Sequence, residues 1–130
     1  MNHLEEVKHL RTEPDGRHYN CAQSLLVPYA PEFGLTPEEA DKLGAFFGSG
    51  MLHGSTCGAL SATLMLMGLA GCTSQQAGEV IRDFRKRHQT SDCATLLSMA
   101  KEQGISRKAH CDGLVMEMAQ VLEEILAQKD

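Results

Sequence analysis

A stretch of twelve residues, 59–70, limits the folds open to this chain more than any other feature. Ten of the twelve are apolar or glycine, and only Ser61 and Thr63 interrupt them. The stretch is shorter than the roughly 20 residues that span a bilayer, so it indicates a helix buried inside the protein rather than in a membrane. We therefore expect a protein built around one central apolar helix, with no membrane insertion.

The rest of the core must come mainly from Leu, Met, Ala and Val, because the chain has no Trp and only six Phe and Tyr residues. This composition suits helices better than a β-sandwich. We predict an all-α fold, a compact multi-helix bundle around the buried central helix. A length of 130 residues lies near the commonest domain size, so residues 1–130 are expected to form a single domain.

Caps, prolines and apolar spacing predict where the helices begin. The predicted starts lie near residues 2, 21, 37, 57, 74, 93 and 107. The second helix is expected to end near Val27, and the third is expected to turn Leu43, Phe46 and Phe47 inward. The last helix has the clearest apolar face, which extends over residues 114–125.

The formal net charge of −5 gives no electrostatic footprint for nucleic acid, since proteins that bind it usually carry a positive face. Residues 82–88 form the one basic cluster, with Arg82, Arg85, Lys86, Arg87 and His88. Cations favour the C-terminus of a helix, which is where this cluster is expected to lie. The alternative is a docking patch for an acidic electron-transfer partner.

The first six residues mix charged and apolar side chains and do not resemble a secretory leader, so a cytoplasmic protein is expected. The five cysteines are an odd number, separated by 36, 15, 21 and 18 positions, and resemble no compact secreted disulfide framework. In a reducing compartment such thiols more often serve a metal, a redox reaction or packing.

Three cysteines directly follow residues that commonly cap a helix, in the pairs Asn20-Cys21, Thr56-Cys57 and Asp92-Cys93. A thiol in the first helical turn lies among free backbone N–H groups at the positive end of the helix dipole, which favours the thiolate. Cys57 is expected to be the most activated thiol, with a pKa below the reference of about 8.5. Gly58 leaves its first turn open, and His53 is near in sequence.

Several segments together carry a family resemblance: Asn20-Cys21-Ala22-Gln23-Ser24, Gly48-Ser49-Gly50-Met51, Cys57-Gly58-Ala59-Leu60-Ser61, Cys93 and Cys111. They resemble the C_GCAxxG_C_C family over about residues 19–125. Ser49 departs from a loop that is usually richer in glycine, and Ala62 replaces a common glycine. The resemblance implies a four-cysteine helical domain in a redox context, in a family whose members are suspected of binding a metal or an iron–sulfur centre.

Four thiolates from Cys21, Cys57, Cys93 and Cys111 match the ligand count of a structural zinc or an iron–sulfur cluster. No Cys-x-x-Cys pair is present, so such a site would depend on the folded chain. Our leading hypothesis is an iron–sulfur centre, with zinc as the alternative, serving electron transfer or redox sensing with a protein partner. Cys72 is expected to lie outside the site, at the far end of the central helix.

Two other functions remain open for the same four cysteines. In one, pairs of them cycle between dithiol and disulfide, as in a thiol–disulfide oxidoreductase. In the other, they are small core residues of a structural or interaction domain. The glycines of residues 48–58 either bring backbone N–H groups close to a cluster or an anion, or only permit tight packing. His53 and His110 are candidates for a ligand or a base, although a lone histidine is more often solvated.

Overall fold

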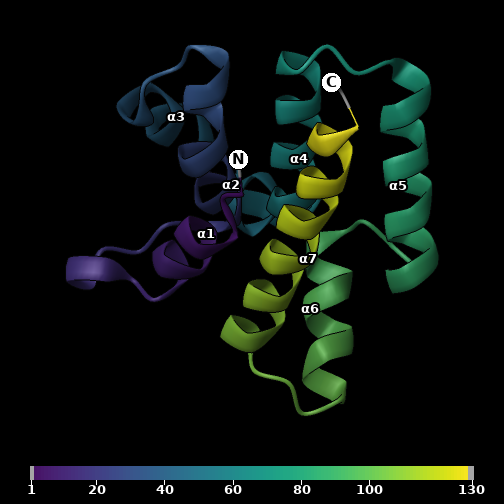
Figure 1. The fold of residues 1–130 in the computed structure, drawn as a ribbon. Helices are drawn as coiled ribbons and strands as arrows, with labels where there is room; N and C mark the ends of the chain where they lie inside the picture. Colours follow the sequence, from purple (N-terminus) through teal and green to yellow (C-terminus); the bar gives the residue numbers. More distant parts are fainter. Residues whose placement is uncertain (1, 129–130) are drawn as a thin grey trace.

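The computed structural model describes residues 2–128, which form seven α-helices and no strand (Figure 1). The α-helices are α1 (Leu4–Arg11), α2 (Cys21–Tyr29), α3 (Pro37–Gly44), α4 (Gly58–Leu69), α5 (Ser74–His88), α6 (Cys93–Glu102) and α7 (Arg107–Ala127). Three short turns complete the order, η1 (Pro14–Gly16), η2 (Ala30–Phe33) and η3 (Gly50–Gly54). The predicted all-α class is confirmed.

Helix α4 is the apolar stretch that the sequence singles out. Seven of its twelve residues are buried, including Leu60, Leu66 and Met67. It contacts α2, α5 and α7, and Figure 1 places it between α2 and α5 with α7 in front. Such a helix needs apolar neighbours on several sides, because no face of it is polar. Within residues 2–128, every helix is too short or too polar to cross a bilayer.

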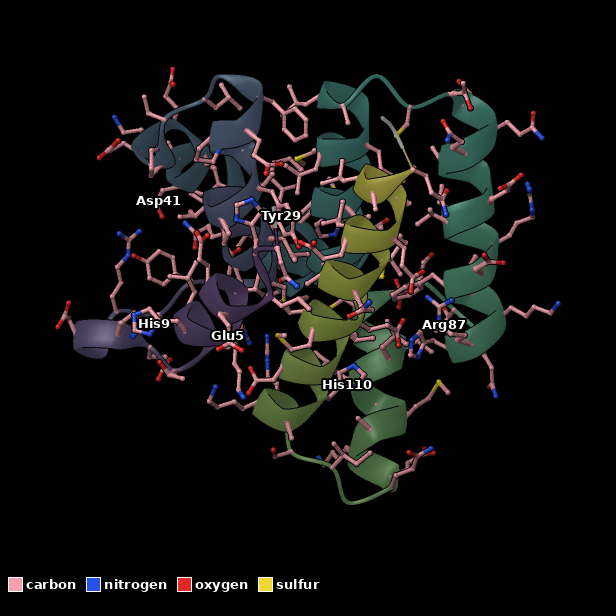
Figure 2. All side chains as sticks on the ribbon, in the orientation of Figure 1. Glu5, His9, Tyr29, Asp41, Arg87 and His110 are labelled. Carbon is pink, nitrogen blue, oxygen red and sulfur yellow. The ribbon has the colours of Figure 1, made fainter. Side chains whose placement is uncertain are left out.

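Helix α7 provides the longest wall of the core. Leu114, Val115, Met118 and Leu122 are buried along one face, which confirms the apolar face predicted for this segment. The helix contacts α1, α2, α4 and α6. The hydroxyl of Tyr29, labelled in Figure 2, donates a hydrogen bond of 2.6 Å to a carboxylate of α7 and so ties α2 to this wall.

The prediction that Leu43, Phe46 and Phe47 point inward is wrong for the first two residues. Leu43 is 50% exposed and Phe46 is 71% exposed, whereas Phe47 is half-buried against the core. Helix α3 instead packs on α2 through its small residues. A Cβ added at Gly44 would lie 3.0 Å from Cδ1 of Leu26, so the backbones approach closely there. Leu43 and Phe46, the latter beyond the end of α3, are instead exposed to solvent.

Local signals place most helix starts correctly. The side chains of Asn20, Thr36 and Thr73 each accept a hydrogen bond from the third helical residue, in reciprocal capping boxes. Helix α2, however, continues beyond Val27 to residue 29, with Pro28 in its last turn. Proline has no N–H to donate to the carbonyl four residues earlier, and the helix ends one residue after it.

A candidate thiol redox site

The structure gathers four of the five cysteines around one cavity of about 320 Å³. Cys21 is the first residue of α2, Cys93 is the first residue of α6, and Cys57 directly precedes α4. Cys111 lies in the second turn of α7. Cys72, beyond the opposite end of α4, does not line this cavity. These are the four thiols that the sequence selected, drawn from four different helices.

A short antiparallel backbone bridge pairs Thr56 with Asp92, the residues that directly precede two of the cysteines. The two hydrogen bonds beside the bridge each use a cysteine amide as donor, Cys57 to the carbonyl of Ser91 at 2.9 Å and Cys93 to the carbonyl of Ser55 at 2.6 Å. The starts of α4 and α6 are therefore joined through their backbones.

The bridge corrects the expected cap at Thr56. This residue pairs with Asp92, and Cys57 itself takes the N-cap position of α4 without a side-chain cap bond. The cap at Asp92 is confirmed, because its carboxylate accepts a hydrogen bond from the backbone N–H of Thr95. A pairing distant in sequence has replaced the local preference of threonine for a cap.

Two glycines of the loop allow the backbone to approach the site closely. A Cβ added at Gly50, where φ is +61°, would lie 2.6 Å from Cβ of Cys93. A Cβ added at Gly58 would lie 2.6 Å from the carbonyl oxygen of Phe47 and 3.3 Å from Cβ of Cys21. Such separations are too short for a side chain, so the packing explanation of the glycines applies at both positions.

Cys21 and Cys111 line the cavity together, and each thiol shifts the pKa of the other. The hydrogen bond from Cys21 lowers the pKa of Cys111 to about 6, against the effect of burial, and the guanidinium groups of Arg11 and Arg107 lower it further. The same hydrogen bond and burial raise the pKa of Cys21. These opposite shifts favour Cys111 as the thiolate of the pair and Cys21 as its protonated partner.

The expected activation of Cys57 is wrong. Its side chain is only 3% exposed, and burial raises its pKa, although the backbone amides of Leu60 and Ala59 in the first turn of α4 oppose the effect. Burial and the charge of Cys111 also raise the pKa of Cys93, against the influence of a nearby arginine. The helix start alone does not activate these thiols, because desolvation is the larger effect.

Arg11 lines the cavity together with Cys111, and it was not among the candidates predicted from the sequence. Its side chain is only 8% exposed. Its guanidinium donates to Oδ1 of Asp112 at 2.8 Å, to the carbonyl of Tyr19 at 2.9 Å and to the hydroxyl of Ser24 at 3.1 Å. The ammonium of Lys108 bonds Asp112 as well, at 3.1 Å. Arg11 and Lys108 thus share the carboxylate of Asp112, the residue that directly follows Cys111.

The histidines differ in their relation to the cavity. His53 is exposed and does not line it, so its expected role at Cys57 has no structural support. His110 does line it, and Figure 2 shows this residue between α7 and α6. Its Nε2 is buried without a hydrogen-bond partner among the described residues, and burial together with His88 lowers its pKa. His18 also lines the cavity and bonds Glu13 at 2.9 Å.

The donor types of the site are those that bind a metal. Four thiols are the ligands expected for zinc or an iron–sulfur cluster. Among residues 2–128, however, no group of three or more His, Cys, Asp or Glu side chains is positioned to hold a metal ion. The iron–sulfur and zinc hypotheses therefore stay predictions, and the thiol pair is the more developed chemical feature.

Comparison with known proteins places this chain in a protein family. A family model described as "Putative redox-active protein (C_GCAxxG_C_C)" matches residues 19–125, which include all four cysteines of the cavity. The chain belongs to this family. The C_GCAxxG_C_C description indicates redox activity and specifies neither a cofactor nor a substrate. No curated protein and no solved structure matches the chain.

Proposed function

We propose that this protein is a thiol–disulfide redox protein that stores two electrons in the Cys21 and Cys111 thiol pair. The observation that carries the proposal is that Cys21 and Cys111 line one cavity together, with the guanidinium groups of Arg11 and Arg107 in the same wall. A thiolate is the nucleophile in disulfide exchange, and an adjacent thiol is needed to complete the exchange. Cys111 supplies the thiolate and Cys21 the second thiol.

The reaction with an oxidised disulfide takes two steps. The sulfur of Cys111 attacks one sulfur of the incoming disulfide, forming a mixed disulfide and releasing one thiolate. That thiolate takes the proton of Cys21, whose sulfur then attacks the sulfur of Cys111 and expels the second thiolate. One disulfide is reduced while one Cys21–Cys111 disulfide forms, and two electrons move to the substrate. A reduced dithiol reverses the same steps.

Cys57 and Cys93 are assigned a different role from the reactive pair. Their pKa values are raised, so both keep their protons at neutral pH and are poor nucleophiles. Cys57 is also almost completely buried in the core. We assign first attack to Cys111 and treat these two thiols as part of the cavity wall.

The test is a redox titration of the reduced protein in dithiothreitol buffers, with disulfides mapped by mass spectrometry. We expect one two-electron transition and a Cys21–Cys111 disulfide. Cys111→Ser should abolish the transition, whereas Cys72→Ser, outside the cavity, should leave it unchanged. A protein that forms no internal disulfide, or that pairs other cysteines first, would contradict the proposal.

A metal centre is the second candidate, because four thiols line one cavity. Anaerobic protein would then contain iron and sulfide, or zinc, in fixed proportion to the chain. Cys57→Ser should strongly reduce that content, and Cys72→Ser should not. Electron transfer or redox sensing with a protein partner, as expected from the sequence, fits either centre. Anaerobic protein without iron, sulfide or zinc would leave the thiol pair as the redox group.

A further inference from the structure

The wall of the thiol cavity is cationic on the side of Cys111. Three cationic side chains line it, Arg11, Arg107 and Lys108, against one carboxylate, Glu13. The protein as a whole carries a net charge of −5, so this local excess is opposite in sign to the rest of the molecule. Charge of this kind in a cavity raises the local concentration of anions.

Most of these charges are already paired. Asp112 accepts hydrogen bonds from both Arg11 and Lys108, and Glu13 bonds His18. Arg107 differs from them. It donates a hydrogen bond of 2.7 Å to the hydroxyl of Ser49, and within residues 2–128 no carboxylate lies at ion-pair distance from it.

Arg107 also has a suitable position relative to the reactive sulfur. It is exposed at the first position of α7, four residues before Cys111. Residues four apart on a helix lie on the same face, one above the other, separated by about one turn of 5.4 Å. A carboxylate attached to a sulfur through two carbons spans a comparable length. The guanidinium of Arg107 presents a planar fork of donors that matches the two oxygens of a carboxylate.

We propose that the cavity binds a low-molecular-weight disulfide that carries carboxylates, with Arg107 binding a carboxylate while the disulfide bond lies against Cys111. The inference rests on the proposed function and adds its substrate class. A volume of about 320 Å³ is at the lower end of the range for small-molecule pockets. The substrate is reduced to two carboxylate-bearing thiols, and the Cys21–Cys111 disulfide forms, by the two attacks described above.

The experiment compares three disulfides of similar size and different charge. They are bis(2-carboxyethyl) disulfide, bis(2-hydroxyethyl) disulfide and bis(2-aminoethyl) disulfide. The rate at which each oxidises the reduced protein is measured anaerobically at pH 8, for wild type and Arg107→Gln. Arg82→Gln is the matched control, because Arg82 is exposed on α5, outside the cavity. Arg107→Lys keeps the charge and tests rescue.

The quantity to compare is the oxidation rate with bis(2-carboxyethyl) disulfide divided by the oxidation rate with bis(2-aminoethyl) disulfide. Loss of Arg107 also removes one of the charges that lower the pKa of Cys111, so all three probes react more slowly. This common slowing cancels in the ratio. We expect this ratio to fall about fivefold in Arg107→Gln, as for one exposed ion pair. It should be unchanged in Arg82→Gln and largely restored in Arg107→Lys.

Failure of the inference and failure of the proposed function give different results. An unchanged ratio in Arg107→Gln, with the Cys21–Cys111 disulfide still forming, overturns the anionic substrate and favours a protein partner. If no probe oxidises the pair, binding of bis(2-carboxyethyl) disulfide to Cys111→Ser is measured by calorimetry. If Cys111→Ser binds this disulfide and the double variant with Arg107→Gln does not, the recognition site is supported. If Cys111→Ser does not bind the disulfide, the recognition site is overturned.

Discussion

Gly58→Ala is expected to destabilise the protein and to disturb the thiol pair at the same time. The added Cβ would lie 2.6 Å from the carbonyl oxygen of Phe47, whereas ordinary contact begins near 3.4 Å. The two atoms must separate by roughly 0.8 Å, an overpacking that costs about 2 kcal/mol. For a chain of this length such a loss lowers the Tm by about 7 °C. Because the same Cβ lies 3.3 Å from Cβ of Cys21, the hydrogen bond from Cys21 to Cys111 should weaken.

The assay combines thermal unfolding by circular dichroism with alkylation of Cys111 across pH, both on reduced protein. Gly68→Ala in the same helix is the control, because nothing lies within 4 Å of its added Cβ. Alanine there should raise stability by about 0.5 kcal/mol, since it has the better helix propensity. If Gly58→Ala is as stable as Gly68→Ala, the close approach to Phe47 and the reasoning from it are refuted.

Three further results are expected. The alkylation rate of Cys111 should rise through about pH 6 and level off by pH 8, and a rate still rising at pH 9 would contradict the thiolate assignment. Because this pKa is lowered on folding, Cys111 contributes stability that is fully present above the unfolded value of about 8.5 and is lost as the pH falls through 6. Urea unfolding between pH 6 and 8.5 should therefore show a smaller gain of stability with pH in Cys111→Ser than in wild type. Tyr29→Phe should cost about 1–3 kcal/mol in the same assay, because the half-buried carboxylate of Glu123 on α7 loses the donor at 2.6 Å; an unchanged midpoint would mean that this hydrogen bond contributes nothing.

The elements that the sequence predicted correctly depend on neighbouring residues. The caps at Asn20 and Asp92 involve a side chain and a backbone amide only three residues away. The apolar face of α7 depends on helical periodicity alone. These features need no knowledge of what packs against them, so they can be derived from the chain directly.

The features that were missed depend on contacts distant in sequence. The face of α3 that packs depends on the surface of α2, which favours the small Gly44 over the bulky Leu43. Activation of Cys111 requires Cys21 and Arg11, both contributed by the other end of the chain. Only Arg107, one turn before Cys111, gave a local signal that could have been used.

The backbone bridge between Thr56 and Asp92 determines which wall of the cavity can open. Two backbone hydrogen bonds hold the starts of α4 and α6 together, whereas the first turns of α7 are held to η3 and α1 by side-chain contacts such as Arg107 with Ser49 and Arg11 with Asp112. Local opening selects the contacts that are cheapest to break and closest to solvent. We therefore expect the fluctuations that admit a reactant to move the wall that carries Cys111 and to leave the wall formed by the starts of α4 and α6 in place.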